Sequence, residues 1–278
     1  MNTETKRLTL REIQLAELDI LLKVRDFFEA NGIRYMLCGG TLLGAVRHGG
    51  FIPWDDDIDV VLTREDFDRL TEIVREQRPS LEGVVFHLPG DEGYMYPYIK
   101  AVNPAIGVDY GKPEDTMLWI DIFVLDHFPD SKFMHWLYLK RIITLERILS
   151  VGTYSDSNMR ERGYFDSFPR RMKMYLARGL YKLMGGYRRI SRRMNEIARA
   201  MNRKYEHSVH VGGSLWPVGM NDYYSAESIA SLTKIKFEGH EFDVPGDYDL
   251  FLREFFGDYM TLPPEDKRQT HYIKAWRV

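Results

Sequence analysis

The sequence predicts an α/β fold of the α+β kind: a mixed sheet with flanking helices, followed by a mostly helical C-terminal half. Two observations lead to this prediction. Short β-branched, apolar stretches alternate with helical patterns through the first 130 residues. From Ser131 onward long helical patterns replace them, until a hairpin and a last helix. We therefore expect three parts: a core (1–130), a basic helical region (131–232) and a C-terminal segment packing back on the core (233–278).

The first helix and the stretch after it carry the clearest local signals. Thr9 and Glu12 form a capping box for a helix that ends at Asn31-Gly32. The stretch YMLCGGTLLGAVRHGGFIPWDDDIDVVL (35–62) then predicts a strand, a glycine pair, a short helix and a second strand. Their expected ranges are 35–37 for the first strand, Gly39-Gly40 for the pair, 41–48 for the helix, and a second strand carrying Asp57 and Asp59.

The remaining elements follow from periodicity and turn residues. Thr63 is expected to cap a helix over 64–77, and Asn103-Pro104 to form a turn between two strands. We expect strands at 84–87, 96–102, 106–110 and 118–125, helices at 131–150, 168–184, 187–206 and 247–256, a polar connector at 154–166, and a hairpin at 234–242.

Composition excludes several classes. The chain has 278 residues, 44% apolar and 28% charged, as in ordinary soluble globular proteins, and its net charge of −3 argues against nucleic-acid binding. Its one cysteine, Cys38, allows no internal disulfide and favours a reducing compartment. The N-terminus lacks a signal-peptide pattern, and no apolar run approaches the ~20 residues that span a bilayer. We expect a cytoplasmic protein, with peripheral contact at the inner face of a membrane left open.

Two carboxylates stand two residues apart in the second strand of the central stretch. Alternate residues of a strand share a face, so Asp57 and Asp59 should project together while Ile58 faces a core. Ionised carboxylates side by side repel each other and are costly to bury. A divalent cation removes that conflict, and oxygen ligands suit Mg²⁺ or Mn²⁺. Asp55 shares the parity of Asp57, so the ligand pair could lie one step earlier.

A third acid, Asp121, interrupts the apolar run LWIDIFVL (118–125). A charge inside such a run needs a partner or a metal. If this strand lies beside the one bearing Asp57 and Asp59, three carboxylates meet and can hold two cations about 3.5–4 Å apart, which polarise a phosphoryl group and activate the attacking oxygen. The structural alternative is an edge strand on which Asp121 is exposed.

Gly39 and Gly40 follow an apolar strand and precede a helix opening at Thr41. Backbone N–H groups at such a place can hold a phosphate, and the helix dipole assists them. Most glycine pairs are only turns. A pair about twenty residues before an Asp-x-Asp strand is much less common.

This order of elements resembles the DNA polymerase beta-like nucleotidyltransferase superfamily. The motif GGTLLGAVRHGGFIPWDDDIDV (39–60) resembles more closely one of its branches, the LicD family, which includes bacterial phosphorylcholine transferases and is similar to the fukutin-related proteins. The resemblance continues in YPYIKAV (96–102), in LWIDIFVLD (118–126) and in 237–271. It covers roughly residues 10–130 and 233–271.

The resemblance implies a nucleotidyltransferase-like catalytic core and a metal-dependent transferase. Such an enzyme moves phosphocholine, or a related phosphoalcohol, from a CDP-activated donor such as CDP-choline to a hydroxyl of a cell-surface glycan or teichoic acid-like precursor, and CMP leaves. Asp57 and Asp59 match the paired metal ligands and Asp121 the third acid, with two Mg²⁺ or Mn²⁺ ions. Asp121 is the candidate to take the proton of the acceptor hydroxyl. Gly40 and Thr41 match the phosphate-facing turn.

Five further residues are candidates for substrate contacts, each with a plain structural alternative. Arg47 could bind a diphosphate or only cap a helix. Trp54 could stack on a base, face a quaternary ammonium, or lie in the core. Lys100 could reach a phosphate or be solvated. Lys267 and His271 lie in the C-terminal family-like segment, where we expect a substrate wall.

Positive charge is concentrated in one region. Lys132 to Lys204 contains 18 lysines and arginines against 5 acids, which leaves the rest of the chain strongly acidic. Solvated helix faces explain this most simply. The alternative is a basic surface that meets a sugar- or lipid-linked glycan acceptor, or makes peripheral membrane contact through 132–204.

Two other functions stay open at this point. The same fold and metals would serve a nucleotidyltransferase that uses an NTP and releases pyrophosphate. A binding protein of the same fold without turnover is the third reading. The complete set Asp57, Asp59 and Asp121 argues against it, because a degenerate relative would be expected to have lost one acid.

Overall fold

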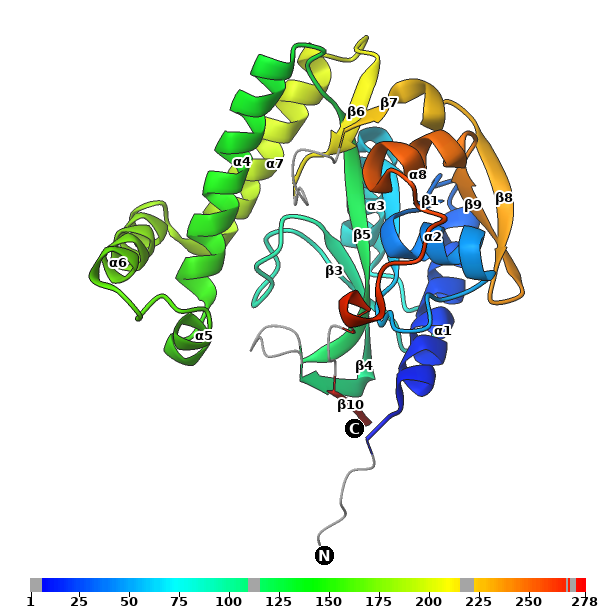
Figure 1. The fold of residues 1–278 in the computed structure, drawn as a ribbon, viewed down its shortest axis with the longest axis horizontal. Coiled ribbons are helices and arrows are strands. Elements are labelled where there is room, and N and C mark those ends of the chain that lie inside the picture. Colours follow the sequence, from blue (N-terminus) through cyan, green and yellow to red (C-terminus); the bar gives the residue numbers. More distant parts are fainter. Residues whose placement is uncertain (1–6, 110–115, 216–222, 269, 271–273) are drawn as a thin grey trace, which may run out of the picture.

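An eight-stranded mixed sheet forms the centre of the computed structural model, which describes residues 7–109, 116–215, 223–268, 270 and 274–278 (Figure 1). Its main strand order is β1-β2-β5-β4-β10, with β3 on β4 and with β6 joining β5 to β7. β2 and β5 are parallel, whereas the other pairs among the described strands are antiparallel. The strands are β1 (Met36–Leu37), β2 (Asp59–Thr63), β3 (Val85–His87), β4 (Ile99–Asp109), β5 (Met117–His127), β6 (His210–Gly213), β7 (Tyr224–Ser225) and β10 (Lys274–Arg277). A separate hairpin joins β8 (Leu232–Phe237) to β9 (His240–Pro245).

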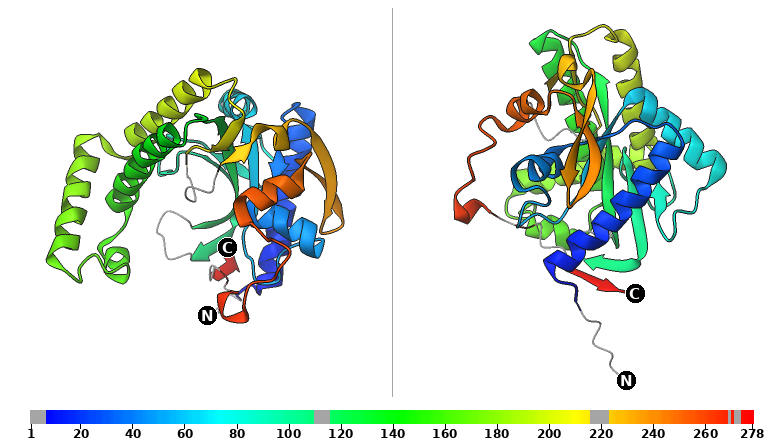
Figure 2. Two further views of the ribbon diagram at one scale, coloured as in Figure 1. Left: turned by 45° about the horizontal axis from the view of Figure 1, so that its top comes forward. Right: turned by 90° about the vertical axis from the view of Figure 1, so that its right-hand side faces the viewer.

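Helices flank this sheet and extend from it on one side. Figure 1 shows α4 and α7 side by side, with α6 at the outer edge of the molecule, and the left view of Figure 2 also shows α6 away from the sheet. The α+β class predicted from the sequence is confirmed. The helices are α1 (Leu10–Ala30), α2 (Gly39–His48), α3 (Arg64–Gln77), α4 (Lys132–Thr153), α5 (Asp156–Glu161), α6 (Phe168–Leu183), α7 (Gly186–Lys204) and α8 (Tyr248–Phe256), with short 3-10 turns η1 (Ala226–Ile229) and η2 (Glu265–Lys267).

Local chemistry explains where several elements begin and end. The Thr9–Glu12 capping box forms at the start of α1, where the Thr9 N–H donates to Glu12 Oε2 at 2.8 Å. Thr63 caps α3 as expected, accepting from the Asp66 N–H. The predicted hairpin turns at Glu238-Gly239, with both residues at positive φ.

The structure corrects three predicted boundaries. β2 begins at Asp59, so Asp57 lies in the extended segment before the strand and not on it. α2 begins at Gly39 and not at Thr41. The two strands expected around Asn103-Pro104 are one strand, β4, whose register with β5 shifts between Asn103 and Gly107. A bulge of this kind accommodates Pro104, which has no N–H for the ladder.

Several short elements were not expected from the sequence. The connector 154–166 contains α5, and β6, β7 and β10 add strands to the sheet. β6 lies within 131–232 and pairs with β5, so that region contributes to the central sheet. The three-part division of the chain stays a prediction. None of the helices in the described ranges combines the length and the apolar character needed to cross a membrane.

A buried ion pair between Arg64 and Asp126 connects α3 to the sheet. Asp126 near the end of β5 is fully buried, and Arg64 at the start of α3 donates to both of its oxygens, from Nε at 2.8 Å and from Nη2 at 2.5 Å. Ser214 Oγ donates to the same carboxylate. Asn195 of α7 accepts from Arg64 Nη1 at 3.5 Å, so one cluster joins α3, β5 and α7.

Candidate active site

Two of the predicted acids meet through the sheet. β2 and β5 pair in parallel with Asp59 directly opposite Asp121, followed by Val60 opposite Ile122. Residues opposite each other in neighbouring strands point to the same face, so both carboxylates emerge together. The Asp121 N–H also donates to Ile58 O at 2.9 Å, which continues the ladder to the residue before β2. Asp121 therefore lies on an inner strand and not on the exposed edge strand of the structural alternative.

The electrostatics of Asp59 show how much negative charge gathers here. Burial, followed by Asp57, Asp121 and Asp55 in that order, raises the pKa of Asp59 well above its usual value. Lys100 acts in the opposite direction on the pKa of Asp59. The charges of the four acids are therefore close enough to act on one another, although Asp57 and Asp55 precede the strand. A cluster of this kind attracts a cation strongly.

Lys100 is part of this cluster and is not a solvated lysine. It lies opposite Asp121 in the β4–β5 pairing, is 3% exposed, and its Nζ stands 3.6 Å from Asp121 Oδ1. The ammonium also lies 3.8 Å from the ring centroid of Trp119 and 4.5 Å from that of Tyr96. β4 begins at Ile99, so the Tyr96 ring meets the ammonium from the segment that precedes the strand.

The glycine pair makes room for the acids. A Cβ at Gly39 would lie 3.0 Å from Asp59 Oδ2, and one at Gly40 would lie 2.5 Å from Asp55 Oδ2. Gly39 also has φ +54°, a conformation that favours glycine. The Thr41 side chain is buried, and its hydroxyl accepts from the Asp59 N–H at 2.9 Å. The predicted phosphate contacts of Gly39, Gly40 and Thr41 stay predictions, and in the structure these residues shape the acid cluster.

Sequence reasoning missed Glu17, a buried acid behind the cluster. This α1 residue is 1% exposed, and its pKa is raised well above the usual value, first by burial and then by Asp57, Asp56 and Asp55. A signal was present, because Glu17 stands four residues after Ile13 on the apolar face of the predicted helix. Glu17 thus adds one more buried carboxyl to the surroundings of the acids.

Arg47 and Trp54 lie together at the edge of the site, near the C-terminal tail. Arg47 Nη1 donates to Tyr259 O at 2.8 Å, and burial together with the charge of Arg268 lowers the pKa of Arg47. The Arg268 guanidinium stands 5.2 Å from the Trp54 ring centroid. Arg268 is thus linked to both residues, because its charge acts on Arg47 and its guanidinium lies over the Trp54 ring. Lys267 is exposed beside Arg268 in η2, and His271 lies outside the described residues.

A small cavity of about 80 Å³ opens beside Asp59. Cys38 is half-buried and lines this cavity. Aromatic rings form part of its lining, and two of them, Tyr224 and Phe251, are stacked at 4.0 Å between centroids and are called the aromatic wall here. The cavity lining therefore combines one carboxylate, that of Asp59, with aromatic rings.

The donor set fits a hard divalent cation, because carboxylate oxygens are the ligands that Mg²⁺ and Mn²⁺ prefer. Within the described ranges, no three acidic, histidine or cysteine side chains are already arranged as a metal site. The raised pKa of Asp59 shows that gathering these carboxylates without a cation is unfavourable. Metal binding would require small side-chain movements at Asp57, Asp59 and Asp121.

Comparison with known proteins agrees with this arrangement. Residues 32–140, which include all three acids, match the family LicD/FKTN/FKRP, nucleotidyltransferase domain. Across 97% of its length the chain is 26% identical to the lipopolysaccharide cholinephosphotransferase LicD of Haemophilus influenzae, 98% of which is covered. A shorter match, 60% identical, relates 38% of the chain to 22% of the ribitol 5-phosphate transferase FKRP of Mus musculus. Residues 32–140 therefore form a LicD-family nucleotidyltransferase domain, and nearly the whole chain is similar to a LicD transferase.

Proposed function

We propose that this protein transfers a phosphoalcohol, with phosphocholine as the first candidate, from a CDP-activated donor to a hydroxyl of a cell-surface glycan or teichoic acid-like precursor. The full-length similarity to a cholinephosphotransferase that acts on lipopolysaccharide supports the transfer and its glycan acceptor. The observation that carries the proposal is the in-register pairing of Asp59 with Asp121 beside Gly39. That pairing brings two acids, far apart in the sequence, to one point of the sheet.

Asp57, Asp59 and Asp121 would hold Mg²⁺ or Mn²⁺, with room in the oxygen donor set for two ions. When bound, the metal withdraws charge from the phosphoryl oxygens. In the reaction the acceptor oxygen forms a bond to the phosphorus of the phosphoalcohol while the bond from that phosphorus to the CMP oxygen breaks. We infer that Asp121 takes the acceptor proton, and Lys100, whose Nζ lies 3.6 Å from Asp121 Oδ1, offsets part of its negative charge.

The edges of the site suggest where the donor lies. After burial, the charge of Arg268 lowers the pKa of Arg47, so the two guanidinium groups lie close enough to bind one anion such as a diphosphate. Trp54 offers a ring for a base. The aromatic wall formed by Tyr224 and Phe251 suits the alcohol part, because a quaternary ammonium binds to aromatic faces.

A donor panel tests this function. The protein is incubated with Mg²⁺ and an acceptor extract, and with CDP-choline, CDP-ethanolamine, CDP-ribitol, CTP or UDP-sugars in turn. We expect CMP from a CDP-alcohol, and its loss in Asp59→Asn. Pyrophosphate from CTP would support the nucleotidyltransferase alternative, and silence with every donor would support a binding protein without turnover.

We propose in addition that the protein contacts a membrane through the outer face of α6, within the basic region 132–204. Five apolar side chains on one helical stripe are 53–81% exposed, while Met174 on the opposite side is buried against α4 and α5. The helix contains five basic residues and no acid. Such a helix suits an anionic bilayer surface, where apolar side chains insert and basic ones meet phosphates. The stripe consists of Phe168, Met172, Tyr175, Leu176 and Leu183.

Vesicle co-sedimentation tests this surface. We expect binding to vesicles containing phosphatidylglycerol, and at least fivefold weaker binding of Phe168→Ser/Leu176→Ser. Val209→Ser/Met260→Ser is the matched control, because both residues are exposed and apolar but lie outside α6. Equal vesicle binding by all three proteins, or concentration-dependent dimers that Phe168→Ser/Leu176→Ser abolishes, would contradict membrane contact through α6.

A further inference from the structure

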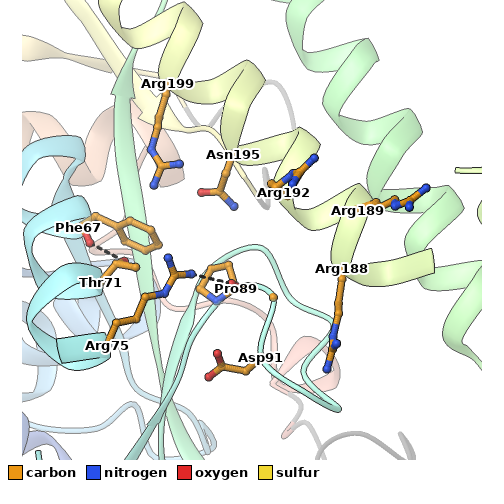
Figure 3. A pocket seen from close by; sticks show the side chains of 11 residues that line it. Phe67, Thr71, Arg75, Pro89, Asp91, Arg188, Arg189, Arg192, Asn195 and Arg199 are labelled. Atoms are coloured by element: carbon orange, nitrogen blue, oxygen red, sulfur yellow. Dashed lines mark hydrogen bonds between the residues drawn. The ribbon is translucent and has the colours of Figure 1, made fainter. Parts of the chain in front are cut away.

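A second charged site lies between α3, the loop at 89–91 and α7, where Figure 3 shows side chains from all three segments around one cavity. Its volume is about 570 Å³. Of its eleven lining residues five are arginines, and one, Asp91, is acidic. We call it the arginine cavity. Its arginines are Arg75, Arg188, Arg189, Arg192 and Arg199.

Two of these arginines have most of their donor groups available. Among the residues that the structure describes, the Arg75 side chain makes one hydrogen bond, from Nη2 to Pro89 O at 3.2 Å. Arg189 makes no ion pair with any residue that the structure describes. A guanidinium carries five N–H donors in a planar fork, so both side chains can bind further acceptors.

Two more arginines have only exposed partners. Arg188 stands 3.8 Å from Glu92, and Arg192 stands 3.4 Å from Glu196, with all four side chains at least 45% exposed. Exposed pairs of this kind contribute little free energy, because water screens the charges and the side chains must be ordered. An incoming anion with two or three negative charges would compete with these acids successfully.

The walls of the arginine cavity are held without any ligand. Arg199 donates to Asp68 from Nε and from Nη2, each at 2.9 Å, and thereby ties α7 to α3. Asn195 is buried in the wall, and its Nδ2 donates to Pro97 O at 3.0 Å. The arrangement is therefore preorganised, and a ligand would not have to bring the helices together.

The arginine cavity is distinct from the acid cluster. Asp121 and Asp126 are five residues apart on β5, so they point to opposite faces of the sheet. Asp126 binds Arg64, and Arg64 reaches Asn195, which lines the arginine cavity. The arginine cavity shares no lining residue with the cavity beside Asp59, so a ligand bound there does not occupy the donor site.

We propose that the arginine cavity binds phosphate groups of the glycan acceptor, away from the hydroxyl that reacts. The arginine forks match phosphate oxygens in geometry and charge, and the concave, basic walls would exclude neutral sugars without phosphate. The identity of the ligand as the acceptor rests on the proposed function. The binding of a phosphate-bearing anion does not, because it follows from the arginines themselves.

Calorimetry with inorganic pyrophosphate as the probe, in EDTA to exclude metal, tests the site. Every protein in this comparison carries Arg47→Ala, so that the diphosphate contact proposed for the donor site does not contribute, and the wild type here means the protein with an unaltered arginine cavity. We compare it with Arg75→Ala/Arg188→Ala, which removes one arginine from each helix. The control is Arg193→Ala/Arg203→Ala, which removes the same charge from α7 residues that do not line the arginine cavity. We expect saturable binding by the wild type and the control, and at least tenfold weaker binding by the cavity variant. Equal affinity in all three, or none in the wild type, overturns the site.

Two further measurements are needed. One distinguishes a phosphate of the acceptor from a lipid headgroup, and the other distinguishes failure of the cavity proposal from failure of the proposed transfer. Vesicles containing phosphatidylglycerol should bind the cavity variant as they bind the wild type. If both pyrophosphate and vesicle binding fall, the phosphate belongs to a lipid headgroup and the acceptor assignment is wrong. Asp59→Asn should bind pyrophosphate like the wild type, so failure of the proposed transfer would leave this result unchanged.

Discussion

Two aspartates of β5, Asp121 and Asp126, lie in very different electrostatic surroundings. Asp126 is fully buried. Its carboxylate accepts hydrogen bonds from Nε and Nη2 of Arg64 and from the Ser214 hydroxyl. Asp121 stands opposite Asp59, with its charge partner Lys100 at 3.6 Å. The first carboxylate is neutralised by a bidentate cation, whereas the second shares one lysine with several other acids.

The difference indicates which acid is structural and which is available for chemistry. A bidentate arginine satisfies the lone pairs of a carboxylate and leaves little capacity for a ligand. The acids around Asp59 exceed the single positive charge of Lys100, and the pKa of Asp59 is raised as a result of burial and its acidic neighbours. A site with surplus buried negative charge favours a cation, as the proposed function requires.

The largest expected effect is the difference in transfer activity between variants of Asp121 and of Asp126. Asp121→Asn should lower transfer at least about 1000-fold, because it removes a metal ligand and proton acceptor. Asp126→Asn should leave activity per folded molecule within about threefold. CMP release, normalised to the folded fraction, measures both. Similar losses in the two variants would contradict the division of roles.

Loss of the buried Arg64–Asp126 pair should lower the free energy of unfolding, although this pair lies outside the proposed chemistry. Arg64→Met should lower the free energy of unfolding by about 3–5 kcal/mol, because it leaves Asp126 charged and buried. Arg69→Met, on the exposed side of the same helix, should cost no more than about 0.5 kcal/mol. Urea unfolding measures both values. An Arg64→Met protein as stable as the Arg69→Met control would show that the pair does not hold α3 to the sheet.

Glu17, a buried acid beside the aspartates near Asp59, should make the stability of the protein depend on pH. Its pKa is raised in the folded protein, so its contribution to stability is fully present below the unfolded pKa and is lost as pH rises through the folded pKa. Glu17→Gln removes that loss, and should stabilise the metal-free protein at pH 8 by on the order of 1 kcal/mol, or about 3 °C in Tm. At pH 4 the two proteins should melt together. A lower Tm for Glu17→Gln at pH 8 would mean that Glu17 is ionised and paired.

Lys100 should give the smallest effect. Lys100→Met removes the positive charge nearest Asp121, so Mg²⁺ should bind more tightly, by about fivefold for a change of about 1 kcal/mol. The Mg²⁺ concentration that raises Tm measures this. Lys140→Met is the control, because Lys140 also lies over a tryptophan ring but far along the chain on α4. Weaker Mg²⁺ binding in Lys100→Met alone would show that the lysine positions the ligands.

Much of the fold could be predicted because its signals are local. Caps at Thr9 and Thr63, the apolar periodicity of α1 and the β-branched run around Asp121 depend on neighbouring residues alone. The short strands β6, β7 and β10 could not be predicted in this way. Their two to four residues carry too little pattern, and they exist because longer strands offer them open edges.

The sequence by itself determined the chemical types at the site: paired acids, a third acid in an apolar run, and glycines ahead of them. Only the tertiary structure decided that Asp59 faces Asp121, that Lys100 joins them, and that Gly39 and Gly40 make space for carboxylates. It also brought arginines of α3 and α7 around one cavity. The reason is physical: strand register and helix packing are set by contacts between residues distant in the chain, which no local pattern specifies.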